Sequence, residues 1–457
     1  MSAAFLLADA ASELALFAAA GFLLFATDDL AVDVIYFTRR AWRTLTVYSR
    51  YPRAFATSIA MLWKPRFIAV FIPAWDESLV IAPMLKATLR RFDHPDYRIF
   101  VGYYRNDPAT AAAIASVADD RIEAVEVHAD GPTTKADCLN HLYDALLGFE
   151  AATGRSPIAI VLHDAEDVVH PFELTLFDQL IDRAGLVQLP VLPLVDPYST
   201  WISGHYCDEF AESHGKELVV REAVGAAVPL AGVGCAIERG ALARLAATQD
   251  GRPFIGGSMT EDYEMGLRLG ALGFKTMFVR IPARTGSSAV VSSRGHFPAS
   301  LDTAVRQKAR WVGGIAFAGW DRLGWRGGLG ERWMRMRDRR GPLAALLMVA
   351  GYAAVLIWMQ LGLASTLGAP LDFHLSPALR TLLTINAWLL GWRVLMRVGF
   401  VTAAYGWKQG LLSVPRLLIG NLVAILAVKR ALFLHAGGGP KLWDKTRHIF
   451  PVEESVS

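Results

Sequence analysis

Residues 342–371 contain no charged side chain, and this feature limits the folds open to the chain. The segment "PLAALLMVAGYAAVLIWMQLGLA" within this region is long enough for a helix to cross the hydrocarbon core of a bilayer. The composition, 53% hydrophobic and only 19% charged, is also too apolar for an ordinary soluble enzyme. We therefore expect a membrane protein. The arginines just before the segment mark that side as cytoplasmic: Arg332, Arg335, Arg337, Arg339 and Arg340.

The beginning of the chain carries a shorter apolar run, "LALFAAAGFLLFA", at 14–26. At 1.5 Å per residue this run reaches only about 20 Å, and a full crossing would include Asp28, Asp29 and Asp33. We expect residues 1–40 to form a membrane anchor, with an interfacial or buried helix as the alternative. Residues 41–65 would form a juxtamembrane linker. The basic residues between 39 and 53 indicate that the next domain is cytoplasmic.

Two more apolar segments follow, at 381–405 and 410–436. The first is expected to return across the membrane, and its Arg393 and Arg397 lie one turn apart on one face. Two explanations for these arginines stay open, namely snorkelling to the interface and lining a polar path. The second segment has positive charge at both ends, which favours an interfacial helix over a crossing one. We assign 341–436 to C-terminal membrane helices and 437–457 to a cytoplasmic tail.

Between the apolar ends, residues 66–304 alternate β-branched strands with amphipathic helices. This order predicts an α/β domain with a doubly wound, mainly parallel sheet. The expected strands are 66–74, 97–105, 121–128 and 156–163, and the expected helices are 78–92, 107–119 and 135–149. In such sheets ligands bind beyond the carboxyl ends of the strands. The polar clusters at those ends are Asp76-Glu77, Asn106-Asp107, the loop of the 130s and Asp164–Asp167.

The stretch "IAIVLHDAEDVVHP" places three acids, Asp164, Glu166 and Asp167, directly after the fourth expected strand. Like charges this close repel one another, so a positive partner is expected beside them. A solvated turn is the ordinary explanation for an isolated acidic triplet. The convergence of four polar clusters on one edge of the sheet makes that explanation less attractive.

Two later stretches add further polar side chains. "SMTEDYEMGLRLGALGF" predicts a helix with Thr260 as N-cap and with Glu261 and Asp262 in its first turn, where helix capping alone would explain the acids. "VRQKARWVGGIAF" carries Gln307, Arg310 and Trp311 within an expected interfacial region, 305–340. Taken alone, this second stretch would be a basic amphipathic helix beside the membrane.

Some classes of protein are disfavoured. The formal net charge is only +3, and no basic stripe interleaved with aromatic residues runs through the middle of the chain, so we expect no nucleic-acid partner. The three cysteines, Cys138, Cys207 and Cys235, form no CxxC pair. Their spacing is typical of reduced cytosolic thiols and not of a disulfide framework or a zinc site.

The order D…DxD…TED…QxxRW, on an α/β sheet flanked by membrane helices, resembles the processive family-2 glycosyltransferases with the GT-A fold. The closer likeness is to the bacterial phage-adsorption protein B family, and it extends from about residue 10 to 452. The stretches that carry it are "FIPAWDE", "YYRNDPAT", "HDAEDVVHP", "DEFAESHGKELVVREAVG", "AGVGCAIERGAL", "TEDYEMGLRL", "RQKARWVGGIAFAGW" and "WDKTRHIFP". That family commonly carries a further C-terminal domain that binds cyclic di-GMP, whereas this chain stops at Ser457. Regulation by that nucleotide is therefore not expected from this chain alone.

The resemblance implies a nucleotide-sugar donor site. Asp164 and Glu166 match the DxD positions, with Glu in place of the second Asp, and would hold Mg²⁺ or Mn²⁺ on the diphosphate. Asp167 would support the ion indirectly. Asp107 matches the aspartate at the uracil edge, and Lys135 matches a lysine on the diphosphate. The segment Ala74 to Glu77 would lie beside the uracil.

The resemblance also implies the catalytic and acceptor residues. Asp262, beside Glu261, would be the general base that deprotonates the acceptor hydroxyl. In the QxxRW motif that begins at Gln307, Arg310 would contact the pyrophosphate and Trp311 would stack on the acceptor sugar. The loop "AGVGCA" would line the acceptor site with Gly232, Gly234 and Cys235.

The expected activity is that of an inverting, metal-dependent hexosyltransferase, because one base without a second nucleophilic carboxylate implies direct displacement. It would use a UDP-sugar, with a UDP-N-acetylhexosamine implied by the family, to polymerise and translocate a bacterial surface or secreted polysaccharide that serves as a phage receptor. Its partners would be the donor, a glycan or lipid acceptor, the inner membrane and an outer-membrane export or receptor protein. Transfer of a single sugar to a lipid carrier, and a non-catalytic assembly or receptor component, are the alternatives.

Overall fold

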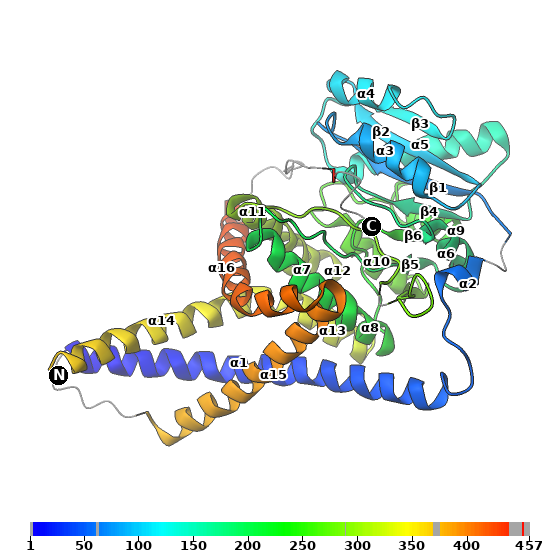
Figure 1. The fold of residues 1–457 in the computed structure, drawn as a ribbon. Helices are drawn as coiled ribbons and strands as arrows, with labels where there is room; N and C mark the ends of the chain where they lie inside the picture. Colours follow the sequence, from blue (N-terminus) through cyan, green and yellow to red (C-terminus); the bar gives the residue numbers. More distant parts are fainter. Residues whose placement is uncertain (1–2, 61–63, 288, 369–374, 438–449, 452–457) are drawn as a thin grey trace.

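The structure is a computed structural model that describes residues 3–60, 64–287, 289–368, 375–437 and 450–451 (Figure 1). The expected tail at 437–457, with the motif "WDKTRHIFP", lies almost entirely outside the described residues.

Seven strands form one sheet in the order β3-β2-β1-β4-β6-β5-β7. The strands are β1 (Ile68–Pro73), β2 (Tyr97–Tyr104), β3 (Ile122–Val127), β4 (Ala159–Leu162), β5 (Leu186–Gln188), β6 (Cys235–Glu238) and β7 (Thr276–Phe278). The first four strands and their parallel pairing confirm the predicted α/β sheet. β6 runs antiparallel to both β4 and β5, so the sheet is mainly and not wholly parallel.

Helices flank the sheet and continue into the apolar ends of the chain. The helices of the α/β part are α2 (Ala56–Ala60), α3 (Ile81–Arg91), α4 (Pro108–Ala115), α5 (Lys135–Thr153), α6 (Glu173–Leu180), η1 (Ile181–Arg183), α7 (Ile202–Glu212), η2 (Ser213–Glu217), α8 (Leu218–Ala223), α9 (Arg239–Ala247) and α10 (Glu261–Ala271). The remaining helices are α1 (Ala3–Thr46), α11 (Leu301–Val312), η3 (Gly313–Ala318), α12 (Gly319–Leu323), α13 (Leu329–Arg339), α14 (Gly341–Thr366), α15 (Pro377–Tyr405) and α16 (Trp407–Gly437).

The alternation of side chains along the strands builds two apolar layers. In β1, Ile68, Val70 and Ile72 pack on the face covered by α3 and α6, whereas Ala69 and Phe71 pack on the face covered by α5, α9 and α10. All five side chains are fully buried. The strand is therefore apolar on both faces, as expected for a central parallel strand between helices.

The direction of β6 decides which loops meet at one edge of the sheet. Parallel strands β1 and β4 end at Pro73 and Leu162, and the acidic loop begins at the next residue after β4. Because β6 is antiparallel to β4, its first residue, Cys235, pairs with Leu162 at that same edge. The glycine-containing loop before β6 is thus brought beside the acidic loop after β4.

Among the described residues, four helices are long and apolar enough to cross a membrane: Leu6–Thr46, Gly341–Thr366, Pro377–Tyr405 and Trp407–Gly437. α1 packs along α14 and α15, and these three helices extend away from the sheet (Figure 1). The apolar N-terminal segment is therefore much longer than the run 14–26 and continues without a break through its three aspartates.

Asp28, Asp29 and Asp33 of α1 are neutralised by arginines and a lysine from distant parts of the chain. Asp28 and Asp29 pair with Arg337 and Arg340 at the end of α13, and Asp33 pairs with Lys216 of η2 at 2.5 Å. The long apolar helix can thus carry these acids because cations contact each of them.

Arg393 and Arg397 on α15 belong to the same set of contacts. Arg393 pairs with Asp29, and Arg397 lies 3.4 Å from Glu212 of α7. Neither explanation considered from the sequence, snorkelling or a polar path, describes these interhelical ion pairs.

α16 packs against α11 and α7 as well as against α14 and α15. Its Arg416 is fully buried, donates to the backbone carbonyl of Thr200 at 2.8 Å and pairs with Asp208 at 3.0 Å. The first part of α16 therefore docks on the α/β part of the molecule (Figure 1).

Candidate functional site

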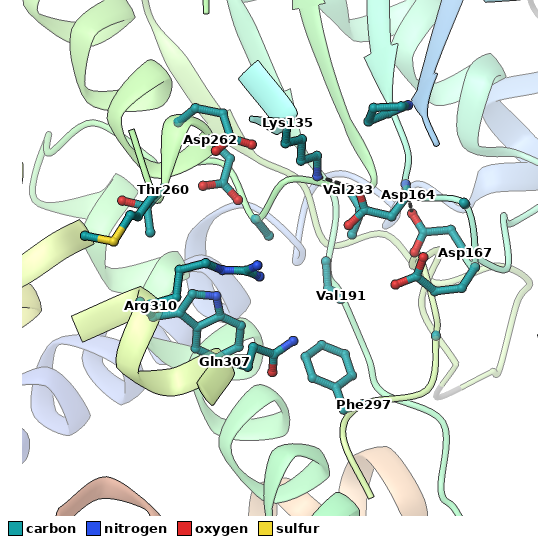
Figure 2. A pocket seen from close by; sticks show the side chains of 18 of the residues that line it. Lys135, Asp164, Asp167, Val191, Val233, Thr260, Asp262, Phe297, Gln307 and Arg310 are labelled. Atoms are coloured by element: carbon teal, nitrogen blue, oxygen red, sulfur yellow. Dashed lines mark hydrogen bonds and ion pairs between the residues drawn. The ribbon is translucent and has the colours of Figure 1, made fainter. Parts of the chain in front are cut away.

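A cavity of about 180 Å³ lies at the sheet edge where the acidic loop and the glycine-containing loop meet (Figure 2). Its lining draws on the ends of β1 and β4, the first turns of α5 and α10, the loop before β6, and α11. The predicted site residues that line it are Glu77, Lys135, Asp164, Glu166, Glu261, Asp262, Gln307, Arg310 and Trp311. Lys135, Glu261 and Arg310, which are separated by 126 and 49 positions along the chain, therefore line one cavity that contains both negative and positive charges.

The acidic loop after β4 is held by two cations of the protein. Lys135, the first residue of α5, forms an ion pair with Asp164. Asp167 accepts hydrogen bonds from the backbone N–H of Asp164 at 3.0 Å and from the Nδ1 of His163 at 2.9 Å. The positive partners expected from the sequence therefore include Lys135 and His163.

His163 is fully buried between two acids. Its Nε2 lies 2.7 Å from the Glu173 carboxylate, and its Nδ1 contacts Asp167. Burial alone would lower the pKa of His163, but Glu173 and Asp167 outweigh it and raise the pKa to about 10. A charged histidine thus fixes Asp167, and Asp167 in turn fixes the backbone of Asp164.

The first turn of α10 presents Glu261 and Asp262 to the cavity. Burial raises the pKa of both carboxyls, and the neighbouring Asp262 helps to raise that of Glu261 to about 7. Lys135 acts in the opposite direction on both. Thr260 occupies the predicted N-cap position, but its side chain makes no capping hydrogen bond within the described structure. Glu261 and Asp262 nevertheless lie in the first turn, as predicted, where the helix dipole favours acids.

The loop before β6 approaches Asp262 closely. Gly232 has φ +81°, and a Cβ added there would lie 2.6 Å from the Asp262 Oδ2, so a side chain at this position would clash. Gln188, at the end of β5, fixes this loop: its side-chain amide donates to the carbonyls of Val233 and Gly234 and accepts from the N–H of Ala231.

α11 closes the opposite side of the cavity with Gln307, Arg310 and Trp311. In Figure 2, Arg310 and Gln307 extend from this helix toward the space below Asp262 and Lys135. Trp311 packs edge-on against Tyr206, with ring centroids 6.1 Å apart. One turn of a single helix thus contributes a cation, an amide and an indole.

Some predicted site residues do not line the cavity. Asp107 caps α4, as predicted, and also accepts from the backbone N–H of Asp76 at 2.6 Å. Ala74 is fully buried at the end of β1, and Cys235 is fully buried in β6. Gly232 and Gly234 lie outside the lining, whereas Ala231 and Val233 of the same loop belong to it.

The sequence analysis missed His163 and Gln188 as supports of the site. His163 was quoted within the acidic stretch, but nothing in the sequence indicated its contact with Glu173. Gln188 ends a three-residue strand, and no motif marks it. Gln188 acts on a loop 45 positions further along the chain, and His163 is buried beneath its own loop against Glu173, so both roles become visible only with the fold.

The arrangement combines groups with complementary chemistry. Asp164, Glu261 and Asp262 can accept protons or hold cations, while Lys135 and Arg310 can bind phosphate oxygens. The indole of Trp311 offers an apolar edge in the same space. Such a cavity suits a ligand that carries both negative charge and hydroxyl groups.

The chain is similar to proteins of known class. Residues 65–314 match the model of the family described as glycosyltransferase like family 2. The chain is 40% identical over 455 residues to bacteriophage adsorption protein B of Escherichia coli (strain K12), and the match covers 93% of this chain. Bacteriophage N4 adsorption protein B of Escherichia coli O157:H7 matches equally. The chain spans about 60% of the length of these relatives.

A solved structure shares the fold. The mannosyltransferase of Pyrobaculum calidifontis, in complex with GDP-Man and Mn²⁺, superposes with a TM-score of 0.52 at 17% sequence identity. The superposition covers 92% of this chain and 99% of that enzyme. The predicted GT-A fold with flanking helices is thereby confirmed, and the family match extends over more than half of the residues. The chain belongs to glycosyltransferase family 2.

Proposed function

We propose that this protein transfers a sugar from a UDP-sugar, a UDP-N-acetylhexosamine, to a growing glycan with inversion at the anomeric carbon. Repeated transfer would polymerise a bacterial surface or secreted polysaccharide. One observation carries the proposal: the acidic loop after β4, the acids of α10 and the Arg310-Trp311 pair of α11 line the same cavity. Three separate motifs of a family-2 glycosyltransferase thus meet in one place.

The residues fit a divalent cation bound together with a diphosphate. Mg²⁺ is usually held by one or two carboxylates plus substrate phosphates and water, and not by a cage built wholly from protein. The cavity offers two such carboxylates, Asp164 and Glu166. The described residues contain no group of three or more His, Cys, Asp or Glu side chains that could hold a metal. The donor diphosphate and water would supply the remaining ligands. When bound, Mg²⁺ or Mn²⁺ would neutralise the charge of the leaving diphosphate.

Asp262 is the proposed general base. It lines the cavity, its pKa is raised by burial, and Gly232 leaves room beside its carboxylate. A raised pKa makes a carboxylate a stronger base, and a positioned base contributes roughly 10²–10⁴-fold to the rate. Asp262 would remove the proton from the acceptor hydroxyl as that oxygen attacks the anomeric carbon. Asp164 adds negative charge nearby and helps burial to raise the pKa of Asp262, while Glu261 lies beside it in the same turn.

The cations and the indole would position the two substrates. Lys135 and Arg310 would bind the diphosphate, and Trp311 would pack against the acceptor sugar. Glu77 would contact the nucleotide side of the donor. Asp107 would act indirectly, because both of its carboxylate oxygens accept from backbone N–H groups near Glu77 and at the start of α4. Cys235 is too deeply buried to touch the acceptor and would only anchor the loop before β6.

The long helices suggest the setting of this reaction. We place residues 1–40 and 341–436 in the bacterial inner membrane, with the domain 66–304 and the interfacial region 305–340 on the cytoplasmic side. The apolar length of four helices supports membrane association. The similarity to phage adsorption protein B supports a glycan product that serves as a phage receptor and is passed to an outer-membrane partner. Translocation through the protein's own helices would connect synthesis to export.

Release of UDP tests this proposal. Membranes that contain the 457-residue chain should release UDP from a UDP-N-acetylhexosamine when Mg²⁺ or Mn²⁺ is present, and chelation should abolish the release. Mass analysis of the glycan should show a ladder of products. If the product is instead a lipid that carries one added sugar, the protein transfers a single sugar and does not polymerise.

The Asp164→Asn variant is the matched control, because it keeps the size of the side chain and removes its charge. It should lose turnover while the purified protein keeps its elution volume and helical content. Turnover that persists at the wild-type rate in this variant, or that is missing with every UDP-sugar tested, would contradict the proposal.

A further inference from the structure

A second, larger cavity lies between the end of α1, α15 and the segment after β7, with a volume of about 780 Å³. This volume falls within the roughly 300–1,000 Å³ of typical small-molecule sites. Its lining shares no residue with the site cavity. The wall between the two cavities is thin, because Val191 and Phe210 face the site while their chain neighbours Leu192 and Ala211 face the second cavity. We call it the arginine cavity.

Four arginines line the arginine cavity: Arg40, Arg43, Arg53 and Arg280. Among the described lining residues there is no Asp or Glu. Within the described part of the chain, these four guanidinium groups also form no ion pair. Four like charges that share one space repel one another, so an anion that binds among them would be strongly favoured.

The pKa values around the cavity agree with an uncompensated positive field. The pKa of Arg280 lies below its usual range, because the protein desolvates the group and because Arg40 carries the same charge nearby. Burial, aided by Arg280, lowers the pKa of His214 on the cavity wall to about 3, so this histidine is neutral. Glu222 is the acid that responds to Arg43, but it does not line the cavity.

Arginines at the end of a membrane helix have a simpler explanation, since they mark the cytoplasmic side and favour a helix C-terminus. That explanation can cover Arg40 and Arg43, which belong to α1. It can also cover Arg53, which follows α1 by a few residues, but it does not cover Arg280, which follows β7. Arg43 and Arg53 both lie over the ring of Tyr48, at 5.3 and 4.4 Å, which fixes them toward each other. Three chain segments, namely α1, the residues that follow α1 and the segment after β7, thus contribute arginines to this cavity.

The wall that α15 contributes to the arginine cavity is apolar. α15 contributes Met396, Phe400, Ala403 and Ala404. Both α1 and α15 are long and apolar enough to cross a membrane, and the cavity lies where α1 ends. A ligand that fits must therefore combine an anionic head with an apolar portion that follows α15 toward the bilayer. Basic pockets beside membrane helices bind anionic lipid head groups in this way.

We propose that the arginine cavity binds the phosphate head group of an anionic membrane phospholipid, with its acyl chains lying along α15. The head group would be held by bidentate contacts to the guanidinium groups, which match phosphate oxygens. This site is separate from the donor and acceptor cavity, so lipid binding does not depend on the proposed transfer reaction.

Native mass spectrometry of the full 457-residue chain tests the proposal. The protein in a nonionic detergent would be titrated with phosphatidylglycerol and, separately, with phosphatidylcholine of the same acyl chains. We expect one phosphatidylglycerol to bind at least tenfold more tightly than phosphatidylcholine. The Arg40→Gln, Arg280→Gln double variant should lose this preference. Equal retention of the two lipids by the wild-type chain would overturn the proposal.

Controls separate the possible sources of the anion. Arg50→Gln removes a charge from the same segment but lies outside the cavity lining, and it should retain the wild-type preference. The Arg53→Gln, Arg280→Gln pair leaves α1 unchanged and should still lose the preference if the first pair fails to fold. Inorganic phosphate and UDP serve as soluble competitors. If either one displaces phosphatidylglycerol at micromolar concentration, the cavity belongs to a soluble anion and the lipid proposal fails.

Discussion

Two groups of buried acids in this molecule differ in the sign of their pKa shifts. In the site cavity, burial raises the pKa of Glu261 to about 7 even though Lys135 lies nearby. At the interface between α7, α15 and η2, Glu212 is equally enclosed, but Arg397 and Lys216 overcome the effect of burial and lower its pKa. The difference teaches that burial alone does not decide the state of a carboxyl group. The balance among burial, the cations that contact it and the acids beside it does.

This contrast separates a reactive site from a structural one. Charges that satisfy one another, such as Lys216 with Asp33 and Glu212, hold helices together and are expensive to disturb. Acids with a raised pKa store unfavourable energy that a substrate or a metal can relieve. Each of the following variants tests whether a charge belongs to a structural ion pair or to the reactive site.

The largest effect is expected for Asp262→Asn. Removal of the proposed base should lower kcat by roughly 10²–10⁴-fold without loss of stability. Initial rates of UDP release and thermal unfolding of the same preparation provide the two measurements. Asp33→Asn is the matched variant on the structural side, and it should lower stability while the folded fraction keeps its kcat. If Asp262→Asn lowered stability and Asp33→Asn lowered kcat instead, the distinction between the two groups would fail.

Lys216→Met should produce the largest loss of stability. Its side chain is only 3% exposed and contacts two acids, at 2.5 and 3.0 Å. Breaking a buried pair by removing one partner typically costs about 3–5 kcal/mol. Thermal unfolding in detergent would measure the loss, and adding Asp33→Asn should restore part of it. Lys135→Met should cost less stability and abolish turnover; an equal loss of stability in both variants would contradict the comparison.

The sequence predicted the catalytic side of this contrast better than the structural side. β1 to β4 were predictable because each is a run of β-branched and aromatic residues, with a recognisable helix between most of them. β5, β6 and β7 have only three or four residues, too few to show a period, and the antiparallel direction of β6 depends on pairing with β4 and β5.

The structural ion pairs could not be predicted for a different reason. Asp28 and Arg340 are 312 positions apart, and Asp33 and Lys216 are 183 apart. From the sequence alone, Asp28, Asp29 and Asp33 are therefore unfavourable in a membrane helix, and both snorkelling and a polar path stay open for Arg393 and Arg397. Motifs order the site residues along the chain, but no local pattern indicates which distant cation neutralises which acid.

A smaller effect, with opposite signs in the two groups, is expected from pH. The folded-state pKa of Glu261 is raised from 4.5 to about 7, so its ionisation destabilises the fold as pH rises through that window. Glu261→Gln should therefore raise Tm more at pH 8 than at pH 5. Because Glu261 and Asp262 interact, the transition reports on the pair.

Glu209 provides the opposite sign. Burial would raise its pKa, but Lys308, at 2.6 Å, and His205 lower it from 4.5 to about 2. Its charge therefore stabilises the fold above pH 4.5, and this stability is lost as pH falls toward 2. Glu209→Gln should lower Tm at pH 7 by an amount that shrinks at pH 4. Thermal unfolding curves at three pH values would measure this change in Tm. If the Tm change has the same pH dependence in the Glu209 and Glu261 variants, the distinction between a structural and a reactive acid fails.

The smallest effect is expected for Asp107, whose carboxylate accepts hydrogen bonds from backbone N–H groups. The partners are the N–H groups of Asp76 and Thr110. Asp107→Ala should lower the free energy of unfolding by about 1 kcal/mol, because the helix cap is lost. The variant should also raise the KM for the donor, because the loop that holds Glu77 is loosened. Asn caps helices as well as Asp does. Asp107→Asn should therefore keep both the stability and the KM of the wild-type chain. A normal Tm with a raised KM in the Asn variant would instead mean that the Asp107 carboxylate contacts the nucleotide directly, which would move this residue from the structural group into the reactive one.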